Sequence, residues 1–283
     1  MQKCDLHTHS VYSDGTYTPN EIIDASIGMG LSAVALCDHN TVDGLPEFLT
    51  AAENKNIEAI AGAEFSVDYN GAELHLLGLF IPENQFAHIS QLMDEVIERK
   101  KQSNINLIAS LNCAGYKINY AHIKESTPNG KFNRAHIAAE LTRKGYTKSI
   151  SHAFDTLLSP EAGYYVEPKR LLFLEMVEFL KSVGAIPVLA HPFLNLSESE
   201  IEALLPIAKE KGLVGMECYY SLYDEKTTDA AFHLIEKYKL KCSGGSDFHG
   251  ENKPDIQLGV GKGNLRIPYH WANMLKRSCK KTV

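Results

Sequence analysis

The sequence predicts an α/β fold that is interrupted by a helical segment. Two observations indicate this: short apolar runs alternate with helical stretches over most of the 283 residues, and no strand pattern occurs between 82 and 168. Such alternation is typical of a barrel or of an open α/β sheet. The seven predicted strands cover 2–6, 32–37, 57–63, 74–79, 185–190, 213–218 and 240–243.

The first strand leads into a histidine-rich stretch, and a helix is predicted over 20–30. Pro19 precedes this helix and Gly28 and Gly30 end it, in keeping with the preference of proline for helix starts and of glycine for helix ends. Further helices of the α/β part are expected over 45–55, 170–183, 198–211 and 224–238.

A β-hairpin is predicted around Asn70-Gly71, the dipeptide most typical of a two-residue hairpin turn. Such a turn places Ser66 opposite His75. Glu64 lies two residues from Ser66 and therefore on the same face, as a diagonal neighbour of His75 within side-chain reach of one atom. A loop of another register would remove this pairing.

Residues 82–168 are predicted to form a helical insertion before the fifth strand. A strand–helix unit takes only about 30 residues, so this stretch is too long for a single connection. Its helices are expected near 84–113, 134–144 and 149–158. We therefore expect three segments, namely the first part of the α/β domain at 1–81, the insertion at 82–168 and the second part at 169–283.

The composition restricts the class of partner. With 28 Lys and Arg against 35 Asp and Glu, the net charge of −7 does not suit a surface that coats long nucleic acid. No apolar run reaches the roughly 18 residues of a membrane span, and the N-terminus lacks the apolar stretch of a signal peptide. The six cysteines are scattered without a CxxC motif, which predicts reduced thiols and a cytoplasmic location.

Histidines and carboxylates gather in short clusters, nearly all at or just after the C-terminal end of a predicted strand. In α/β barrels the active site is built at that end. Nine ligands exceed the four of a tetrahedral zinc and favour two or three divalent ions, and imidazole with carboxylate suits Mn²⁺, Fe²⁺ or Zn²⁺. The nine residues are His7, His9, Asp14, His39, Glu64, His75, His191, Asp247 and His249.

Taken singly, these clusters have simpler interpretations. His7 and His9 could be surface residues at a polar strand end, and Glu64 with His75 could be a buried ion pair. If the metal site forms, Asp5 is placed to orient a ligating imidazole from behind.

The clusters, taken in order, resemble those of the PHP (polymerase and histidinol phosphatase) family. The matching residues are DLHTHS at 5–10, Asp14-Gly15, CDHN at 37–40, Glu64, His75, AHP at 190–192 and GSDFHG at 245–250. The resemblance implies a distorted (β/α)7 TIM-like barrel with a trinuclear metal site. It implies one ion held by His7, His9, Glu64 and Asp247, a second by Glu64, His75 and His191, and a third by Asp14, His39 and His249.

The insertion resembles that of the small phosphoesterase branch, which includes 3′,5′-nucleoside bisphosphate phosphatases and 5′→3′ exonucleases acting on short RNA. The segment NRAHIA at 133–138 carries this resemblance and implies that Arg134 and His136 contact substrate phosphate, with the insertion as a substrate cap. Branch members usually carry a basic residue soon after AHP. Phe193 and Leu194 stand there in this chain, so that phosphate contact is either missing or supplied elsewhere.

The resemblance implies a metal-dependent phosphoric ester hydrolase in which a hydroxide bridging two ions attacks phosphorus. We expect His191, Asp247 and Glu64 to be central to catalysis, Mn²⁺ to be the working ion, and the substrate to be a nucleotide or short RNA. Two alternatives stay open: a phosphatase of another small phosphomonoester such as histidinol phosphate, and a non-catalytic module that binds metal or nucleotide.

Overall fold

The computed structural model describes residues 2–125 and 133–279 and divides the chain into two units. The first unit joins Met1–Met93 to Leu171–Val283, and the second is Asp94–Arg170. All seven strands belong to the first unit, which carries the candidate site described below.

The strands form one sheet in sequence order. They are β1 Lys3–Thr8, β2 Leu31–Leu36, β3 Glu58–Tyr69, β4 Ala72–Leu79, β5 Ile186–Ala190, β6 Gly215–Tyr220 and β7 Lys241–Gly245. Only β4 runs antiparallel to its two neighbours; all other pairs are parallel. Thr8 at the end of β1 bridges to Phe248 just after β7, so the sheet closes almost completely into the predicted seven-stranded barrel.

The predicted hairpin register is confirmed, with Ser66 opposite His75. Asn70 and Gly71 have φ angles of 53° and 88°, the left-handed backbone that a two-residue hairpin turn requires. The third strand is longer than the predicted 57–63, because β3 continues through the hairpin arm to Tyr69.

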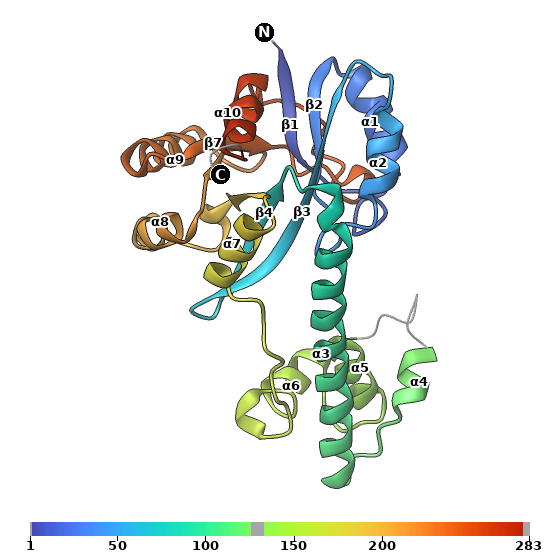
Figure 1. Cartoon of the computed structure of the whole chain (residues 1–283). Helices are drawn as coiled ribbons and strands as arrows, with labels where there is room; N and C mark the ends of the chain where they lie inside the picture. The colour runs from blue at the N-terminus through green and yellow to red at the C-terminus, as the bar shows by residue number, and fades with distance from the viewer. Residues whose placement is uncertain (1, 126–132, 280–283) are drawn as a thin grey trace. The chain divides into compact units, whose positions relative to one another are not determined.

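Helices cover the outside of the barrel (Figure 1). Those of the first unit are α1 Pro19–Gly28, α2 Leu45–Ala52, α7 Phe173–Ser182, α8 Glu198–Lys211, α9 Glu225–Tyr238 and α10 Tyr269–Cys279. Capping boxes begin two of them: Thr18 pairs with Glu21 at α1, and Ser197 pairs with Glu200 at α8. Helices α1 and α2 pack together outside β2 and β3, and α7, α8 and α9 follow one another beside β5 and β6.

Helix α10 was not predicted, although it completes the barrel core. It contacts β1, β2, β5 and β7, and Trp271 and Leu275 join a buried cluster with strand residues such as Leu6, Ile60 and Leu79. In the sequence, this segment has only short apolar runs and follows a glycine-rich stretch, so little indicates a helix there.

The second unit is helical in the residues described. Helix α3, Phe86–Cys113, begins in the first unit and ends in the second, where α4 Tyr120–Glu125, α5 Arg134–Arg143 and α6 Ile150–Asp155 follow. Leu107, Leu111, Ile137 and Leu141 belong to a separate buried cluster. Across the described parts of the chain, no helix combines the length and apolar character needed to cross a membrane.

Because β7 lies very close to β1, we expect one methyl group added at Gly245 to destabilise the fold strongly. A Cβ on Gly245 would lie 2.1 Å from His7 Cβ and 2.6 Å from its backbone nitrogen. We expect Gly245→Ala to lower the free energy of unfolding by about 3 kcal/mol or more, at or above the upper end for overpacking. Gly28→Ala, in α1 with no atom within 4 Å of the added Cβ, should instead gain about 0.5–1 kcal/mol. Urea denaturation measures both; equal stabilities would contradict the packing described.

Candidate metal centre

The structure brings the nine predicted histidines and carboxylates together at one edge of the barrel. His7 lies in β1, Glu64 in β3 and His75 in β4, while the others lie in the segments that follow β1, β2, β5 and β7. Since β4 runs antiparallel, His75 near its start lies at the same edge as the ends of the parallel strands. The antiparallel hairpin therefore adds an imidazole that a purely parallel barrel would place at the opposite edge.

Glu64 is the centre of this cluster and is fully buried. Its Oε1 lies 2.8 Å from His75 Nδ1 and 2.9 Å from His191 Nε2. Its Oε2 lies 3.2 Å from His7 Nε2, 3.3 Å from His9 Nε2 and 3.1 Å from His39 Nδ1. Both oxygens thus face several imidazoles, an arrangement suited to a carboxylate shared between cations.

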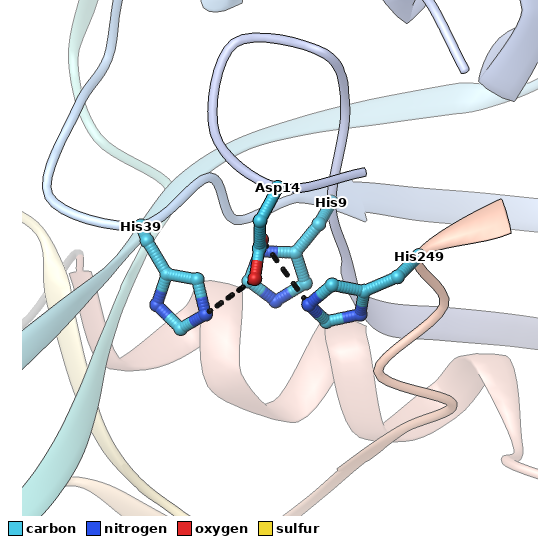
Figure 2. Close-up of side chains that lie close together, drawn as sticks. All are labelled: His9, Asp14, His39 and His249. Carbon is cyan, nitrogen blue, oxygen red and sulfur yellow. Dashed lines mark ion pairs between the residues drawn. The ribbon is translucent and has the colours of Figure 1, made fainter. Parts of the chain in front are cut away.

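Asp247 and Asp14 face the remaining imidazoles. Asp247 Oδ1 lies 3.1 Å from His9 Nε2 and 3.7 Å from His7 Nε2. Asp14 Oδ1 lies 3.2 Å from His249 Nε2, and Figure 2 shows this carboxylate directed at the surrounding imidazole rings. Each aspartate therefore extends the cluster on a different side of His9.

A short loop returns Asp14 to the cluster. The Asp38 carboxylate accepts hydrogen bonds from the Ser10 backbone at 2.7 Å and from the Ser13 hydroxyl at 2.6 Å. Gly15 allows the tight return, because a Cβ there would lie 2.3 Å from the His9 carbonyl oxygen. Asp38, which precedes His39 in the sequence, thus fixes the loop that carries another cluster residue.

Two cluster residues have a left-handed backbone conformation that residues other than glycine rarely adopt. The φ angles are 24° for His191 and 58° for Asp247. Such conformations cost on the order of 1–3 kcal/mol each and often occur at functional sites, where surrounding contacts hold them. Backbone hydrogen bonds hold both residues, from His191 to the Glu217 carboxylate at 2.9 Å and from Asp247 to the His7 carbonyl at 2.8 Å.

Glu217 in β6 was missed by the sequence analysis. It is fully buried, and its Oε1 lies 3.0 Å from His7 Nδ1, so it holds the imidazole from behind with Nε2 directed at Glu64. The prediction that Asp5 has this role is wrong. Asp5 accepts hydrogen bonds from backbone groups of His7, Ser246 and Gly259 and holds the loops together instead. A charged residue inside the apolar run LVGMEC was the available signal for Glu217.

The electrostatics favour ionised carboxylates in the cluster. Burial alone would raise the pKa of Glu64, but His7, His191 and His75 outweigh it and hold that pKa well below its usual value. Burial lowers the pKa of His7, but the nearby carboxylates of Glu64 and Glu217 raise it by more. The pKa of His7 therefore lies well above its usual value. The raised pKa favours the protonated imidazole when no metal ion is bound, and a cation that replaces the proton binds less well as pH falls.

The chemistry of the site fits divalent ions. Of the nine buried side-chain atoms without a hydrogen-bond partner in the described residues, six belong to the cluster. They are His7 Nε2, both ring nitrogens of His9, Glu64 Oε2, His75 Nδ1 and His249 Nε2. Buried polar atoms left unpaired cost free energy, and close nitrogen–oxygen approaches without hydrogen-bond geometry are expected where ligands converge on a cation.

The side chains fall into overlapping groups of possible ligands. One group is His7, His9, Glu64 and Asp247; a second is His9, Asp14, His39 and His249; a third is His39, Glu64 and His75; and a fourth is His7, His191 and Glu217. Within each group the ligand atoms lie within 4.8 Å of one another. Glu64, His7, His9 and His39 each appear in two groups, which favours more than one ion.

The two predicted substrate contacts lie in the second unit. The Arg134 guanidinium lies 4.1 Å from the centre of the Tyr165 ring and 5.7 Å from that of Phe154. His136 Nδ1 accepts a hydrogen bond from the Asn133 backbone at 3.1 Å, which caps the start of α5. Their contact with a substrate stays a prediction.

Comparison with known proteins agrees with this geometry. Residues 5–170 match the PHP domain. A 5′-3′ exoribonuclease of Haemophilus influenzae is 28% identical over 249 residues, which cover 88% of this chain and 90% of that protein. The 3′,5′-nucleoside bisphosphate phosphatase of Chromobacterium violaceum is 29% identical over 264 residues, covering 90% and 91%. A solved amidohydrolase structure from C. violaceum, with bound sulfate and no metal, has a TM-score of 0.67 at 27% identity and covers 98% and 96%.

The shared position of Glu64 predicts how metal affects stability. We expect Mn²⁺ to raise the unfolding temperature of chelator-treated protein, because an ion that binds only the folded state stabilises it by about 2.7 kcal/mol at 100 times its dissociation constant. Glu64→Gln keeps the shape but removes the shared charge, and should reduce this rise sharply. Glu53→Gln, at the exposed end of α2, should retain it. Calorimetry with and without Mn²⁺ measures the effect, and an undiminished rise in Glu64→Gln would contradict the assignment.

Proposed function

The chain belongs to the PHP domain family and is a metal-dependent phosphoesterase, and we propose that it hydrolyses 3′,5′-nucleoside bisphosphates or short 5′-phosphorylated oligoribonucleotides. The observation that carries this proposal is the buried Glu64 carboxylate, whose two oxygens face different imidazoles of the cluster. The substrate class follows the activities of the exoribonuclease and the bisphosphate phosphatase described above.

We propose that the nine cluster residues hold two or three divalent ions, with Mn²⁺ as the working ion and Fe²⁺ or Zn²⁺ as alternatives. Glu64 is suited to bridge, since each of its oxygens faces different imidazoles. Bound ions of this kind lower the pKa of coordinated water and neutralise phosphate oxygens. They would also make the site positive inside a chain whose net charge is −7, so that it attracts anions.

The protein's own groups set the geometry of this chemistry. Glu217 orients the His7 ring from behind and also holds the His191 backbone. His191 follows β5 at the polar edge, is only slightly exposed, and its Nε2 lies 2.9 Å from Glu64 Oε1. We propose that His191, Asp247 and Glu64 are the residues on which turnover depends most.

We propose that the helical insertion, 82–168, caps the substrate and supplies phosphate contacts through Arg134 and His136. The rings of Tyr165 and Phe154 support this, since they hold the Arg134 guanidinium in one orientation. A guanidinium can bind a phosphate through two parallel hydrogen bonds. We further propose a cytoplasmic location, where cysteines such as Cys4, Cys37 and Cys218 stay reduced.

His191→Ala tests this function. With Mn²⁺, we expect wild-type protein to release phosphate from 3′,5′-bisphosphonucleotides or nucleotides from short 5′-phosphorylated RNA, in a panel that includes histidinol phosphate. His191→Ala should lower kcat/KM by about 10²- to 10³-fold, the scale for losing one preorganised active-site group. His233→Ala, on the exposed face of α9, should leave activity unchanged.

The panel separates the alternatives. Exclusive turnover of histidinol phosphate would favour a phosphatase of another small phosphomonoester. Folded protein that binds Mn²⁺ and hydrolyses none of the esters would instead be a metal-binding module, and the proposed function would be wrong.

A further inference from the structure

One ammonium group lies at the candidate metal centre. Among the described residues, Lys253 is the only Lys or Arg that forms an ion pair with any of the nine cluster residues, through Nζ and Asp247 Oδ2 at 2.7 Å. The Lys253 side chain is 38% exposed, whereas that of Asp247 is 5% exposed. The ammonium therefore lies between the buried cluster and solvent.

The loop that carries Lys253 is anchored to the loop that carries Asp14. The Glu251 backbone donates a hydrogen bond to Thr16 Oγ1 at 2.9 Å, and the Asn252 side-chain amide donates one to the Asp14 carbonyl at 2.7 Å. Gly250 has a φ of 63° and lets this loop pack against the loop that carries Asp14. Contacts between two loops that carry cluster residues thus fix the backbone position of Lys253.

The two oxygens of Asp247 face different groups. Oδ1 lies 3.1 Å from His9 Nε2, on the side of the candidate ligands. Oδ2 accepts hydrogen bonds from the Tyr220 hydroxyl at 2.9 Å and from Lys253 at 2.7 Å. Tyr220 already anchors this oxygen from the buried side. An ammonium has three N–H donors, so Lys253 can donate to Asp247 and still donate to an anion that enters the site.

We propose that Lys253 contacts a non-bridging oxygen of the substrate's phosphoryl group and favours dianionic phosphate monoesters over monoanionic diesters. This inference rests on the proposed function. Lysine binds phosphate as a point charge, and a second negative charge on the phosphoryl group strengthens that attraction. Tyr220, which is neutral and directed at the same carboxylate oxygen, has only the role of positioning Asp247.

Lys253→Met and Tyr220→Phe separate these roles, because each removes one hydrogen bond to Asp247 Oδ2 but only the first removes a charge. The probe is inorganic phosphate, titrated calorimetrically into Mn²⁺-saturated protein. Lys253→Met should weaken phosphate binding by about 10- to 100-fold, the range for a hydrogen bond to a charged group. Tyr220→Phe should weaken Mn²⁺ binding while phosphate affinity at saturating Mn²⁺ stays close to that of wild type. Lys253→Arg should restore part of the phosphate affinity, and Lys262→Met, exposed in a later turn, controls for the change in net charge.

Steady-state kinetics give a second measurement. For a phosphate monoester, Lys253→Met should raise KM more than it does for a diester with the same leaving group. If Lys253→Met and Tyr220→Phe weakened Mn²⁺ binding to the same extent and also weakened phosphate binding to the same extent, Lys253 would only position Asp247. That result would overturn the proposal. So would undiminished phosphate binding in Lys253→Met, or wild-type protein that binds no phosphate.

The proposed function can fail separately. Wild-type protein that binds phosphate but hydrolyses no ester would refute the hydrolysis. A weakened phosphate affinity in Lys253→Met would still support the contact in that case.

Discussion

A fully buried glutamate, Glu64, lies at the centre of the candidate metal centre and is surrounded by imidazoles. Five histidines approach the two oxygens of Glu64 within 3.3 Å. An ionised carboxylate cannot remain in a dry interior without compensating charge. Protons on the imidazoles can provide that charge, and so can divalent cations. Several of the approaches lack hydrogen-bond geometry, and cations also give partners to those unpaired nitrogens and oxygens.

The fold satisfies this constraint through contacts distant in sequence. The antiparallel β4 brings His75 opposite Ser66 and next to Glu64. Closure of the barrel from β1 to the segment after β7 brings Asp247 beside His7 and His9. Around these residues lies a second set, with Glu217 behind His7 and Asp38 behind the loop of Asp14. These two carboxylates determine how the His7 ring and the loop that carries Asp14 are oriented.

How much the sequence could predict depended on whether a local signal existed. The Asn70-Gly71 turn fixes a register, so the proximity of Glu64 and His75 followed from strand geometry alone. Glu217 was missed because a single acid in an apolar strand gives no indication of which face it lies on. The prediction that Asp5 orients an imidazole was wrong because β1 has register irregularities, which the sequence does not reveal. The Asp5 side chain accepts backbone hydrogen bonds instead. Lys253 could not be found at all, because its position depends on how two loops pack together.

Anomalous scattering from crystals grown with Mn²⁺ locates the bound ions relative to Glu64. We expect at least two peaks, with each oxygen of Glu64 about 2.0–2.2 Å from an ion and with imidazole nitrogens at similar distances, as is usual for divalent ions bound by nitrogen and oxygen. Crystals at neutral pH in which Glu64 contacts only imidazoles, with no peak in the cluster, would contradict this expectation.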